Sequence, residues 1–430
     1  MSIIHLRRAT GASHRLPGSP CRERPSTDCR FVHGALDLTE PADRTEAADL
    51  VERSLARLES YLVREQYRGW DPYDALSSPL FRLPVLRSSR WIRLAAMQTL
   101  RRLPFNPRRL LGIPKGYNPV TLAFVLEASA YRALADPERA DVHRRRAAEC
   151  VAELDRVRTR GFSGACWGYD FDWEARYGRL PAGTPTVVAT GLVTNALFVA
   201  YRLLGLADAF ALCRSAVPFV LEDLPRLPGD DDTFCWGYFP GNAQRVPNAT
   251  MKGARLCAQV YSVTREESVL SPARQTVEYV ARHQHDDGSW PYAVGDARSW
   301  VDNFHTAYVL DALDEYARLT NGVSLRPVLE KGWRFYRSTF FVDDRIPKYY
   351  AHSLFPIDAT ACAQSLLTLC RFGDLATARE VASWTIGNMQ CEDGHFAYQR
   401  RRRLLVTIPY MRWSSAYMYL GLSRVSEALA

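Results

Sequence analysis

The sequence predicts an all-α protein in which six helical hairpins close into an (α/α)6 toroid. Three observations predict this fold class: an aromatic turn that recurs along the chain, an apolar helix start that recurs after it, and an amphipathic stretch that fits each gap. Repeats of this kind indicate the whole architecture, because one unit cannot bury its apolar face alone. The unit is an outer helix, an aromatic turn and an inner helix, about 55 residues long.

The aromatic turn is clearest where the run Gln284–Trp290 leads into Pro291 and Tyr292. Its Gln-x-x-Asp-Gly pattern recurs at Gln390–Gly394, and we expect these turn residues to be architectural, tying an outer helix to the next turn. Tyrosine holds the third position of every copy. The copies are Trp167-Gly168-Tyr169, Trp236-Gly237-Tyr238, Trp290-Pro291-Tyr292, Lys348-Tyr349-Tyr350 and Phe396-Ala397-Tyr398, with a looser copy at 69–73.

Each aromatic turn is followed by the start of an inner helix, most often marked by threonine. Every start precedes an apolar run that is apolar nearly all round, as a helix covered on both sides should be. The starts are Pro119-Val120-Thr121, Val188-Ala189-Thr190, Asn248-Ala249-Thr250, Phe304-His305-Thr306, Asp358-Ala359-Thr360 and the stretch Tyr410–Trp413.

Six amphipathic, more charged helices fit the gaps, near 44–66, 139–158, 207–224, 265–284, 325–340 and 374–389. No linker divides the chain after residue 44, so residues 44–430 are predicted to form one toroid domain. The largest insertions are an Arg-rich segment at about 75–118 and the loop 161–185. Residues 1–43 are rich in Arg, Pro and Ser, and we expect them to be disordered.

Composition narrows the function. The ten cysteines have neither a CxxC pair nor a ligand spacing, so we expect reduced core thiols, no metal or cofactor, and a cytoplasmic location. No apolar run is long enough to predict a membrane span. The net charge is +8, and no acidic residue occurs between Asp74 and Glu127. The Arg82–Arg109 region is either solvated surface or a contact for an anionic partner such as a membrane surface, whereas no nucleic-acid recognition motif accompanies it.

Candidate site residues follow from the repeat, because all inner helices of such a toroid start at the same mouth. Helix N-termini favour anions there, and aromatic faces suit sugar rings or an isoprenoid chain. The candidate catalytic residues are His305, Asp302, Asp172, Tyr292 and Asp358. The candidate substrate-binding residues are Trp167, Tyr169, Asp170, Arg176, Tyr238, Asn248, Trp290, Asn303, His352, Tyr410, Arg412 and Trp413.

His305 is the strongest candidate, since the equivalent position is Ala in three other repeats. A His with nearby carboxylates is sufficient for general acid–base catalysis, and paired carboxylates would suit glycoside hydrolysis. Asp170 and Asp172 would point the same way in an extended piece. Several candidates have structural alternatives: Asp302, Asn248 and Asp358 as helix caps, the turn tyrosines as repeat packing, and Arg412 as a buried ion-pair partner.

The residues also carry a family resemblance. The Gln-x-x-Asp-Gly-Ser-Trp turn at 284–290 resembles the turn of the squalene cyclase and prenyltransferase superfamily. The six-hairpin count resembles glycan-processing α/α toroids such as unsaturated glucuronyl hydrolases, N-acylglucosamine 2-epimerases, uronate epimerases and polysaccharide lyases. The segment 408–423 is similar to the last inner helix of the glucuronyl hydrolase type. The whole chain resembles bacterial toroid proteins of polysaccharide gene clusters.

The resemblance implies an enzyme acting on an acidic or amino sugar, as lyase, epimerase or hydrolase. From the residues at the mouth, we expect His305 to be the acid/base and Arg412 and Arg176 to bind a carboxylate or phosphate. Partner acids or anchors for sugar hydroxyls would be Asp172, Asp302 and Asp358. Two alternatives remain. Asp230-Asp231-Asp232-Thr233 resembles the protonation motif of class II terpene cyclases, although Gly229 replaces its first Asp. The other alternative is a non-catalytic toroid that binds a glycan or a partner.

Overall fold

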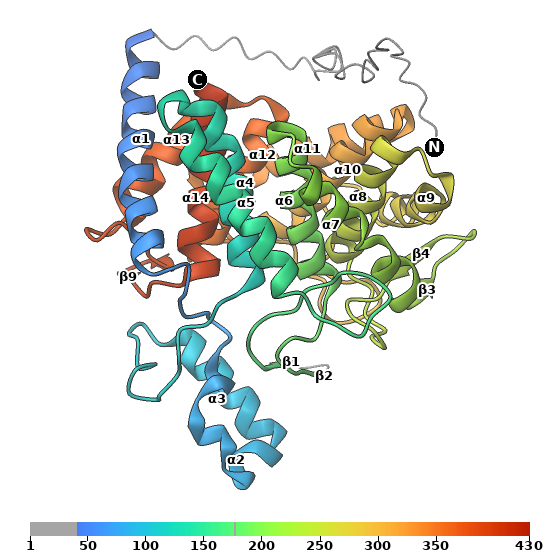
Figure 1. Cartoon of the computed structure of the whole chain (residues 1–430), viewed down its shortest axis with the longest axis horizontal. Helices are drawn as coiled ribbons and strands as arrows, with labels where there is room; N and C mark the ends of the chain where they lie inside the picture. Colours follow the sequence, from blue (N-terminus) through green and yellow to red (C-terminus); the bar gives the residue numbers. More distant parts are fainter. Residues whose placement is uncertain (1–40, 176–177) are drawn as a thin grey trace, which may run out of the picture. The chain divides into compact units, whose positions relative to one another are not determined.

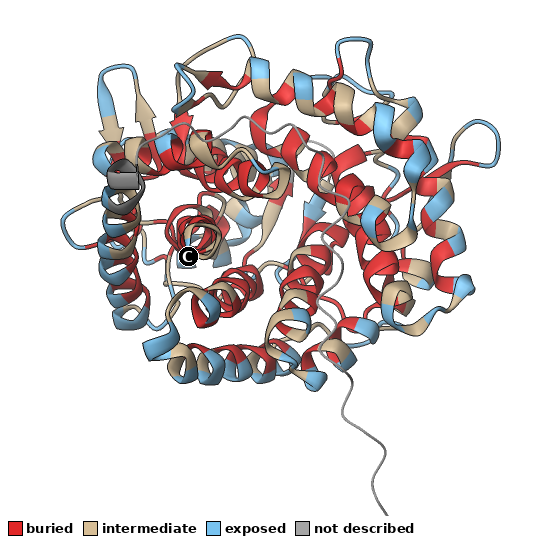
Figure 2. Ribbon diagram, turned by 90° about the horizontal axis from the view of Figure 1, so that it is seen from above, coloured by how far each residue is buried: buried red, intermediate tan, exposed pale blue. Residues whose placement is uncertain are grey.

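The computed structural model describes residues 41–175 and 178–430. The predicted disorder of residues 1–43 falls almost wholly outside the described residues, and residues 41–43 belong to the first helix. Residues 41–430 form two concentric rings of helices, joined by short loops and small two- or three-stranded sheets (Figure 1). Seen from above, the inner helices are mostly buried and the outer helices expose only their outward faces (Figure 2). The predicted (α/α)6 toroid is confirmed.

The inner ring consists of six helices that pack side by side in chain order. The last helix packs against the first, so the ring is closed. All six begin within a few residues of the predicted starts, although α14 is preceded by a π-helical turn at Met411–Ala416. The helices are α4 (Pro119–Ala135), α6 (Val187–Leu204), α8 (Pro247–Thr264), α10 (Asn303–Thr320), α12 (Ala359–Phe372) and α14 (Tyr417–Leu429).

The outer ring covers the inner one, each outer helix packing on the inner helix that precedes it, with α1 on α14. One predicted helix, 207–224, is broken: it ends at Arg214 and resumes as a π-helical turn at Phe219–Asp223. Pro218 lies in the break, and proline lacks the N–H that a continuous helix needs. The helices are α1 (Pro41–Arg64), α5 (Ala140–Arg156), α7 (Ala207–Arg214), α9 (Glu267–Arg282), α11 (Arg326–Thr339) and α13 (Leu375–Met389).

The connections from outer to inner helices carry the insertions and short antiparallel strands. The basic insertion forms α2 (Pro84–Ser88) and α3 (Arg90–Arg102), which project beyond the double ring in Figure 1. Met97 and Leu100 of α3 are buried against the last repeat. The strands are β1 (Trp173–Ala175), β2 (Gly178–Leu180), β3 (Arg226–Pro228), β4 (Phe234–Trp236), β5 (Phe341–Val342), β6 (Ile346–Pro347), β7 (Ile357–Asp358), β8 (Gln399–Arg401) and β9 (Leu404–Val406).

The recurring tryptophans and threonines hold each unit together. The indole of Trp167 donates to the Leu154 carbonyl at 2.8 Å, and that of Trp290 donates to the Val280 carbonyl at 2.9 Å. Each bond engages a carbonyl in the last turn of an outer helix, where the regular intrahelical hydrogen bonds end. The Thr190 hydroxyl accepts from the Trp167 backbone N–H at 3.1 Å, which ties the turn to its inner helix. These motif residues are therefore architectural.

The Gln-x-x-Asp-Gly turns are architectural, as expected, but they join neighbouring outer helices as well as tying each outer helix to its own turn. The Gln284 amide donates to the Val328 carbonyl in α11 at 2.9 Å, and the Gln390 amide donates to the Ser54 carbonyl in α1 at 3.0 Å. Gly394 lies against α1 so closely that a Cβ there would be 2.3 Å from the Arg57 carbonyl oxygen. The turn after α13 thus closes the outer ring onto α1.

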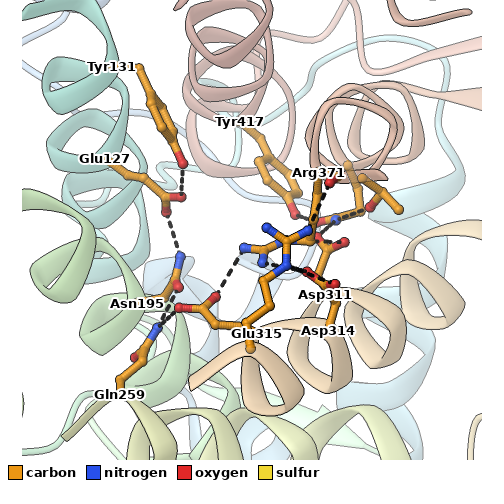
Figure 3. Close-up of polar contacts among 12 residues, drawn as sticks. Glu127, Tyr131, Asn195, Gln259, Asp311, Asp314, Glu315, Arg371 and Tyr417 are labelled. Carbon is orange, nitrogen blue, oxygen red and sulfur yellow. Dashed lines mark hydrogen bonds and ion pairs between the residues drawn. The ribbon is translucent and has the colours of Figure 1, made fainter. Parts of the chain in front are cut away.

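The interior of the ring is polar, which corrects the expectation of inner helices that are apolar nearly all round. A belt of hydrogen bonds and ion pairs crosses five inner helices (Figure 3). Asn195 donates to Glu127 at 2.9 Å, and Gln259 donates to Asn195 at 3.0 Å and to Glu315 at 2.8 Å. Arg371 donates to Glu315 at 3.0 Å. Burial raises the pKa of Glu127 to about 7, so this carboxyl group is partly protonated at neutral pH.

The belt reaches the sixth inner helix through Gln364, whose amide donates to Asp311 at 2.8 Å and accepts from the Tyr417 hydroxyl of α14. Among the described residues, one helix, Val187–Leu204, is long and apolar enough to cross a membrane, contrary to the expectation that no apolar run has that length. It is α6 of the inner ring, and most of its residues are buried there.

The eight cysteines in the described residues are free thiols, and the predicted compartment stays a prediction.

The closure of the outer ring can be tested with Gly394→Ala. The residue has φ +100°, and an added Cβ would collide with the α1 backbone. Gly161 has a similar φ of +91° but nothing within 4 Å of its Cβ position, so Gly161→Ala reports the left-handed strain alone. We expect that control to lose about 1–2 kcal/mol of unfolding free energy. Gly394→Ala should lose at least about 1 kcal/mol more in urea denaturation. Equal losses would contradict this role.

Candidate active site

His305 and Asp302 form a hydrogen-bonded pair at the mouth, where α10 begins. Asp302 is the N-cap of α10: its Oδ1 accepts from the His305 backbone N–H at 3.0 Å. Its Oδ2 lies 2.7 Å from His305 Nδ1 and also accepts from the Trp300 indole at 3.1 Å. Asp302 is buried, whereas 22% of the His305 side chain is exposed. This arrangement protonates Nδ1 and leaves Nε2, which has no partner among the described residues, available to a ligand.

A continuous cluster of aromatic rings surrounds this pair. The Tyr292 ring stands edge-on to His305 at 4.7 Å, and the Phe304 ring is 4.1 Å from it. Trp413 lies 6.1 Å from Phe304 and 5.7 Å from Tyr73, and Trp173 lies 6.1 Å beyond Tyr73. Most of these rings are only partly buried, so their faces are open to a ligand. We call Tyr73, Trp173, Tyr238, Tyr292, Phe304 and Trp413 the aromatic cluster.

A second charged group, Arg412 with Asp71, lies at the same mouth. The Arg412 Nε donates to Asp71 Oδ2 at 2.7 Å, and the guanidinium stacks 4.9 Å from the Tyr169 ring and 5.2 Å from the Trp413 ring. The terminal nitrogens of Arg412 make no hydrogen bond to the described residues. Arg412 is thus a buried ion-pair partner, one of its two predicted roles, and it retains donors for a carboxylate.

Asp170 faces this ion pair across a cavity of about 50 Å³ that also includes Asn118. The Asn118 amide donates to Asp170 Oδ1 at 2.7 Å. Burial by the surrounding protein raises the pKa of Asp170, and the Asp71 carboxylate adds to the increase. A larger open hollow of about 620 Å³ is lined by residues 282–285, by Pro291 and Ser299, and by residues 293–296. None of the catalytic candidates lines it, and its lining comes from the end of α9 and the turn that follows.

The insertion contributes a second arginine to the mouth. Arg101 of α3 donates to the Tyr73 hydroxyl at 3.1 Å and lies 5.3 Å from the centre of that ring. Tyr73 belongs to the aromatic cluster, so the basic insertion reaches the site and is not only surface. Tyr73 raises the pKa of the Arg101 guanidinium, and the neighbouring Tyr398 and Asp358 add to the increase.

Five predicted substrate-binding residues have packing roles instead. Asn303 is fully buried and accepts a hydrogen bond from the Tyr336 hydroxyl at 3.0 Å. Tyr410 is fully buried beneath the Arg108 guanidinium at 4.8 Å. At most 4% of each of the five residues is exposed, which leaves almost no surface for a ligand. The five residues are Trp167, Trp290, Asn248, Asn303 and Tyr410.

The expectation that Asp170 and Asp172 point the same way is corrected. Asp172 is held by the Ala182 N–H at 2.8 Å and by Arg179 at 2.5 Å, and it lines a different cavity next to the insertion. His352 is exposed in the loop after Tyr350, whose ring lies 5.6 Å away. Arg176 lies outside the described residues. Of the predicted catalytic residues, His305, Asp302 and Tyr292 come together.

Asp358 is fully buried and satisfied by three donors. Its oxygens accept from the Thr360 N–H at 2.9 Å, the Gln399 amide at 2.8 Å and the Trp413 indole at 3.0 Å. The residue caps α12 and positions Trp413, so it supports the aromatic cluster from behind. Burial raises the pKa of Asp358 to about 6.

The mouth is less electropositive than six bare helix N-termini would make it. In four of the inner helices, the side chain of the N-cap residue accepts a hydrogen bond from a backbone N–H of the first turn. These N-cap residues are Asn118, Thr186, Asp302 and Asp358. Two of these caps are carboxyl groups, which counter the helix dipole. Any preference for an anionic ligand therefore depends on Arg412 and Arg101.

Sequence reasoning missed Asp71, Arg101 and Lys252. Asp71 follows the tryptophan of the first aromatic turn, where the other copies have Gly, Pro, Tyr or Ala, and this departure could have revealed it. Lys252 is the one lysine in the inner-helix apolar runs. Its ammonium lies 3.5 Å from the Tyr308 ring centre and has no hydrogen-bond partner among the described residues. Burial and the nearby Arg255 lower its pKa well below the ordinary value.

No protein-family model matches the sequence, and no curated protein is similar to it at a significant level. Solved structures do share the fold. A family 76 glycoside hydrolase (mannosidase) from Bacteroides thetaiotaomicron has a TM-score of 0.57 and 8% identity over 89% of this chain and 98% of its own. An unsaturated glucuronyl hydrolase specific for heparin has a TM-score of 0.56 and 12% identity over 88% and 97%.

The cellobiose 2-epimerase of Bacillus thermoamylovorans has a TM-score of 0.55 and 10% identity, over 72% of this chain and 87% of its own. At such identities the likeness establishes the fold. The chain therefore has the six-hairpin α/α toroid fold that these sugar-processing enzymes share.

The buried Asp358 predicts a pH-dependent effect of Asp358→Asn. Because its folded-state pKa of about 6 exceeds the unfolded value of about 3.9, the native state binds the proton more tightly, and this group destabilises the protein as pH rises from about 4 to 6. Asparagine removes the titration and keeps an acceptor for Thr360 and Trp413. Relative to wild type, the variant should gain about 2–3 kcal/mol between pH 4.5 and pH 7.5 in urea unfolding. A pH-independent difference would contradict this.

Proposed function

With the six-hairpin toroid fold as the premise, we propose that this protein is a carbohydrate-active enzyme acting on an acidic sugar. Its reaction is proton transfer at a carbon next to a carbonyl or carboxylate, as in epimerisation or β-elimination. The observation that carries this proposal is the His305–Asp302 pair, which presents Nε2 of an oriented imidazole within the aromatic cluster. An imidazole titrates near neutral pH and suits a base that removes a carbon-bound proton.

Asp302 serves this chemistry in two ways. Its Oδ2 accepts a hydrogen bond from the Nδ1–H of His305, and this fixes the tautomer in which Nε2 is the base. After Nε2 takes a proton, the buried carboxylate 2.7 Å away stabilises the imidazolium. Because Asp302 also caps α10, the backbone and the imidazole are positioned by the same side chain. The Trp300 indole holds the second carboxylate oxygen in place.

The rest of the mouth supplies sugar recognition. The partly exposed faces of Trp413, Tyr73 and Trp173 can stack on the C–H faces of sugar rings. The unused guanidinium nitrogens of Arg412 suit a uronate carboxylate, whose charge they would stabilise as an enolate forms. The similar structures support a sugar substrate, since they include a mannosidase, a glucuronyl hydrolase and an epimerase.

A second candidate is glycoside hydrolysis. Asp170 carries it, because the raised pKa of this carboxyl group is what a general acid needs, and the Asp71 carboxylate lies across the same cavity. The terpenoid cyclase alternative has less support. Its acidic run at Asp230–Asp232 is an exposed turn between β3 and β4, where Asp231 pairs with Arg282 on the surface. The mouth instead gathers several polar groups among its rings, which favours a sugar.

The proposal is tested by deuterium exchange. Wild-type protein is incubated in D₂O with uronate-containing oligosaccharides, and products are followed by mass spectrometry and NMR. Proton transfer at carbon incorporates deuterium at the reacting carbon or yields an unsaturated sugar, whereas hydrolysis does neither. We expect His305→Gln and Asp302→Asn to lose at least about 10²-fold in rate. Asparagine remains a good N-cap, so the second variant should keep its fold.

The matched control is His285→Gln, because His285 lies in a repeat turn outside the mouth and bonds Ser289 at 3.0 Å. It should keep wild-type activity. Cleavage without deuterium incorporation, abolished by Asp170→Asn and retained by His305→Gln, would replace the first candidate with the second. Full activity of His305→Gln on every substrate that is turned over would refute the assignment of the base.

A further inference from the structure

The segment 80–110 of the insertion exposes an unusual set of apolar side chains. Six of the thirteen exposed large hydrophobic residues identified in the described part of the chain lie in this segment. Trp91 at the start of α3 is 76% exposed, Val85 in α2 is 74% exposed and Leu110 is 92% exposed. The six are Leu80, Leu83, Val85, Trp91, Phe105 and Leu110. Figure 1 shows α2 and α3 projecting away from the helical rings.

The same segment is cationic throughout. No acidic residue occurs between Asp74 and Glu127, and five arginines of the segment are exposed. Those arginines are Arg82, Arg87, Arg90, Arg102 and Arg109. A solvent-exposed surface with mixed tryptophan, aliphatic and arginine side chains, and no carboxylate of its own, has the composition of interfacial membrane-binding segments.

A cavity of about 280 Å³ lies beside this surface, lined by Arg82, Arg87, Arg93 and Arg179. Two of the four are already paired: Arg93 with Glu174 at 2.7 Å and Arg179 with Asp172 at 2.5 Å. The side chains of Arg82 and Arg87 have no acidic partner among the described residues. Guanidinium groups bind phosphate oxygens through two parallel hydrogen bonds, so the cavity suits the phosphate of a lipid headgroup.

We propose that residues 80–110 dock the protein on an anionic lipid bilayer, with Trp91, Val85 and Leu110 entering the interface and lipid phosphates at Arg82 and Arg87. A bilayer fits these observations better than a protein partner. The apolar side chains come from separate short turns and helices, and a membrane accepts such scattered tips without a matched surface. A stable protein interface would need about 800 Å² of complementary area on each partner. Stacking aromatics for nucleic acid are few here.

Docking would orient the candidate active site. α3 carries Trp91 at its exposed start and Arg101, which reaches the aromatic cluster, near its end. One short helix thus carries a residue of the proposed membrane-facing surface and a residue that reaches the mouth. The docking proposal itself does not depend on the proposed enzymatic reaction, and its test uses no substrate.

The test is co-sedimentation of the full chain with vesicles of phosphatidylcholine, with or without phosphatidylglycerol. We expect binding to the anionic vesicles only, weakened by added salt. The double variant Trp91→Ser/Leu110→Ser should bind at least about tenfold more weakly, because it removes apolar surface that would enter the membrane. Arg82→Gln/Arg87→Gln should lose much of the binding and of its salt dependence.

Matched controls lie away from this segment. Val323→Ser changes a residue that is 78% exposed at the turn between α10 and α11, and Arg334→Gln removes an exposed arginine of α11. Both should bind as wild type does. The absence of binding to anionic vesicles would overturn the proposal, as would binding unaffected by the Trp91 and Leu110 changes. Equal or tighter binding to a duplex RNA or an acidic protein, lost in the arginine variant, would assign the surface to that partner instead.

Discussion

The packing of α14 against α4 closes the inner ring, and the remaining features depend on that closure. A closed ring packs each inner helix between two inner neighbours and against at least one outer helix. It also places all inner N-termini, with the turns before them, at one mouth. The hydrogen-bond belt from Glu127 through Asn195, Gln259 and Glu315 to Arg371 links successive helices from within. Each of these five residues has a hydrogen-bond partner, although the buried Oε1 of Gln259 has none among the described residues.

The candidate site uses the chemistry of a helix start. Asp302 would cap α10 in any protein, because its side chain satisfies a backbone N–H that has no intrahelical partner. Here its second oxygen also holds His305 Nδ1, so capping and imidazole orientation come from one carboxylate. Asp358 has the same two roles one repeat later, because it caps α12 and accepts a hydrogen bond from the Trp413 indole. The side chains at the mouth are therefore held as rigidly as the starts of the inner helices to which their partners belong.

The insertion adds to the toroid both a part of the candidate active site and a projecting surface. Arg101 extends from α3 to Tyr73, and Met97 and Leu100 anchor the same helix on the last repeat. The exposed charged residues of the insertion are all basic, and six large apolar side chains are exposed among them. One short segment thus contributes to the aromatic cluster on one side and offers a membrane-compatible surface on the other.

Repetition in the sequence determined the fold. The spacing of the turns and threonines predicted the helices and their order, because repeated residues tend to make matching contacts. Trp167 with Leu154 and Trp290 with Val280 are such a pair, whereas the Trp236 indole has no partner among the described residues. The departure of His305 from the alanines of other repeats indicated a special position by the same logic. Tertiary structure alone decided which side chains share a space. It separated Asp170 from Asp172, buried Asn303 and Tyr410, and brought Asp71 and Arg412 together across 341 positions of sequence. Helical periodicity cannot distinguish a face that points into the ring from one that points outward. The closed ring was therefore needed to place the polar belt and Lys252 in its interior.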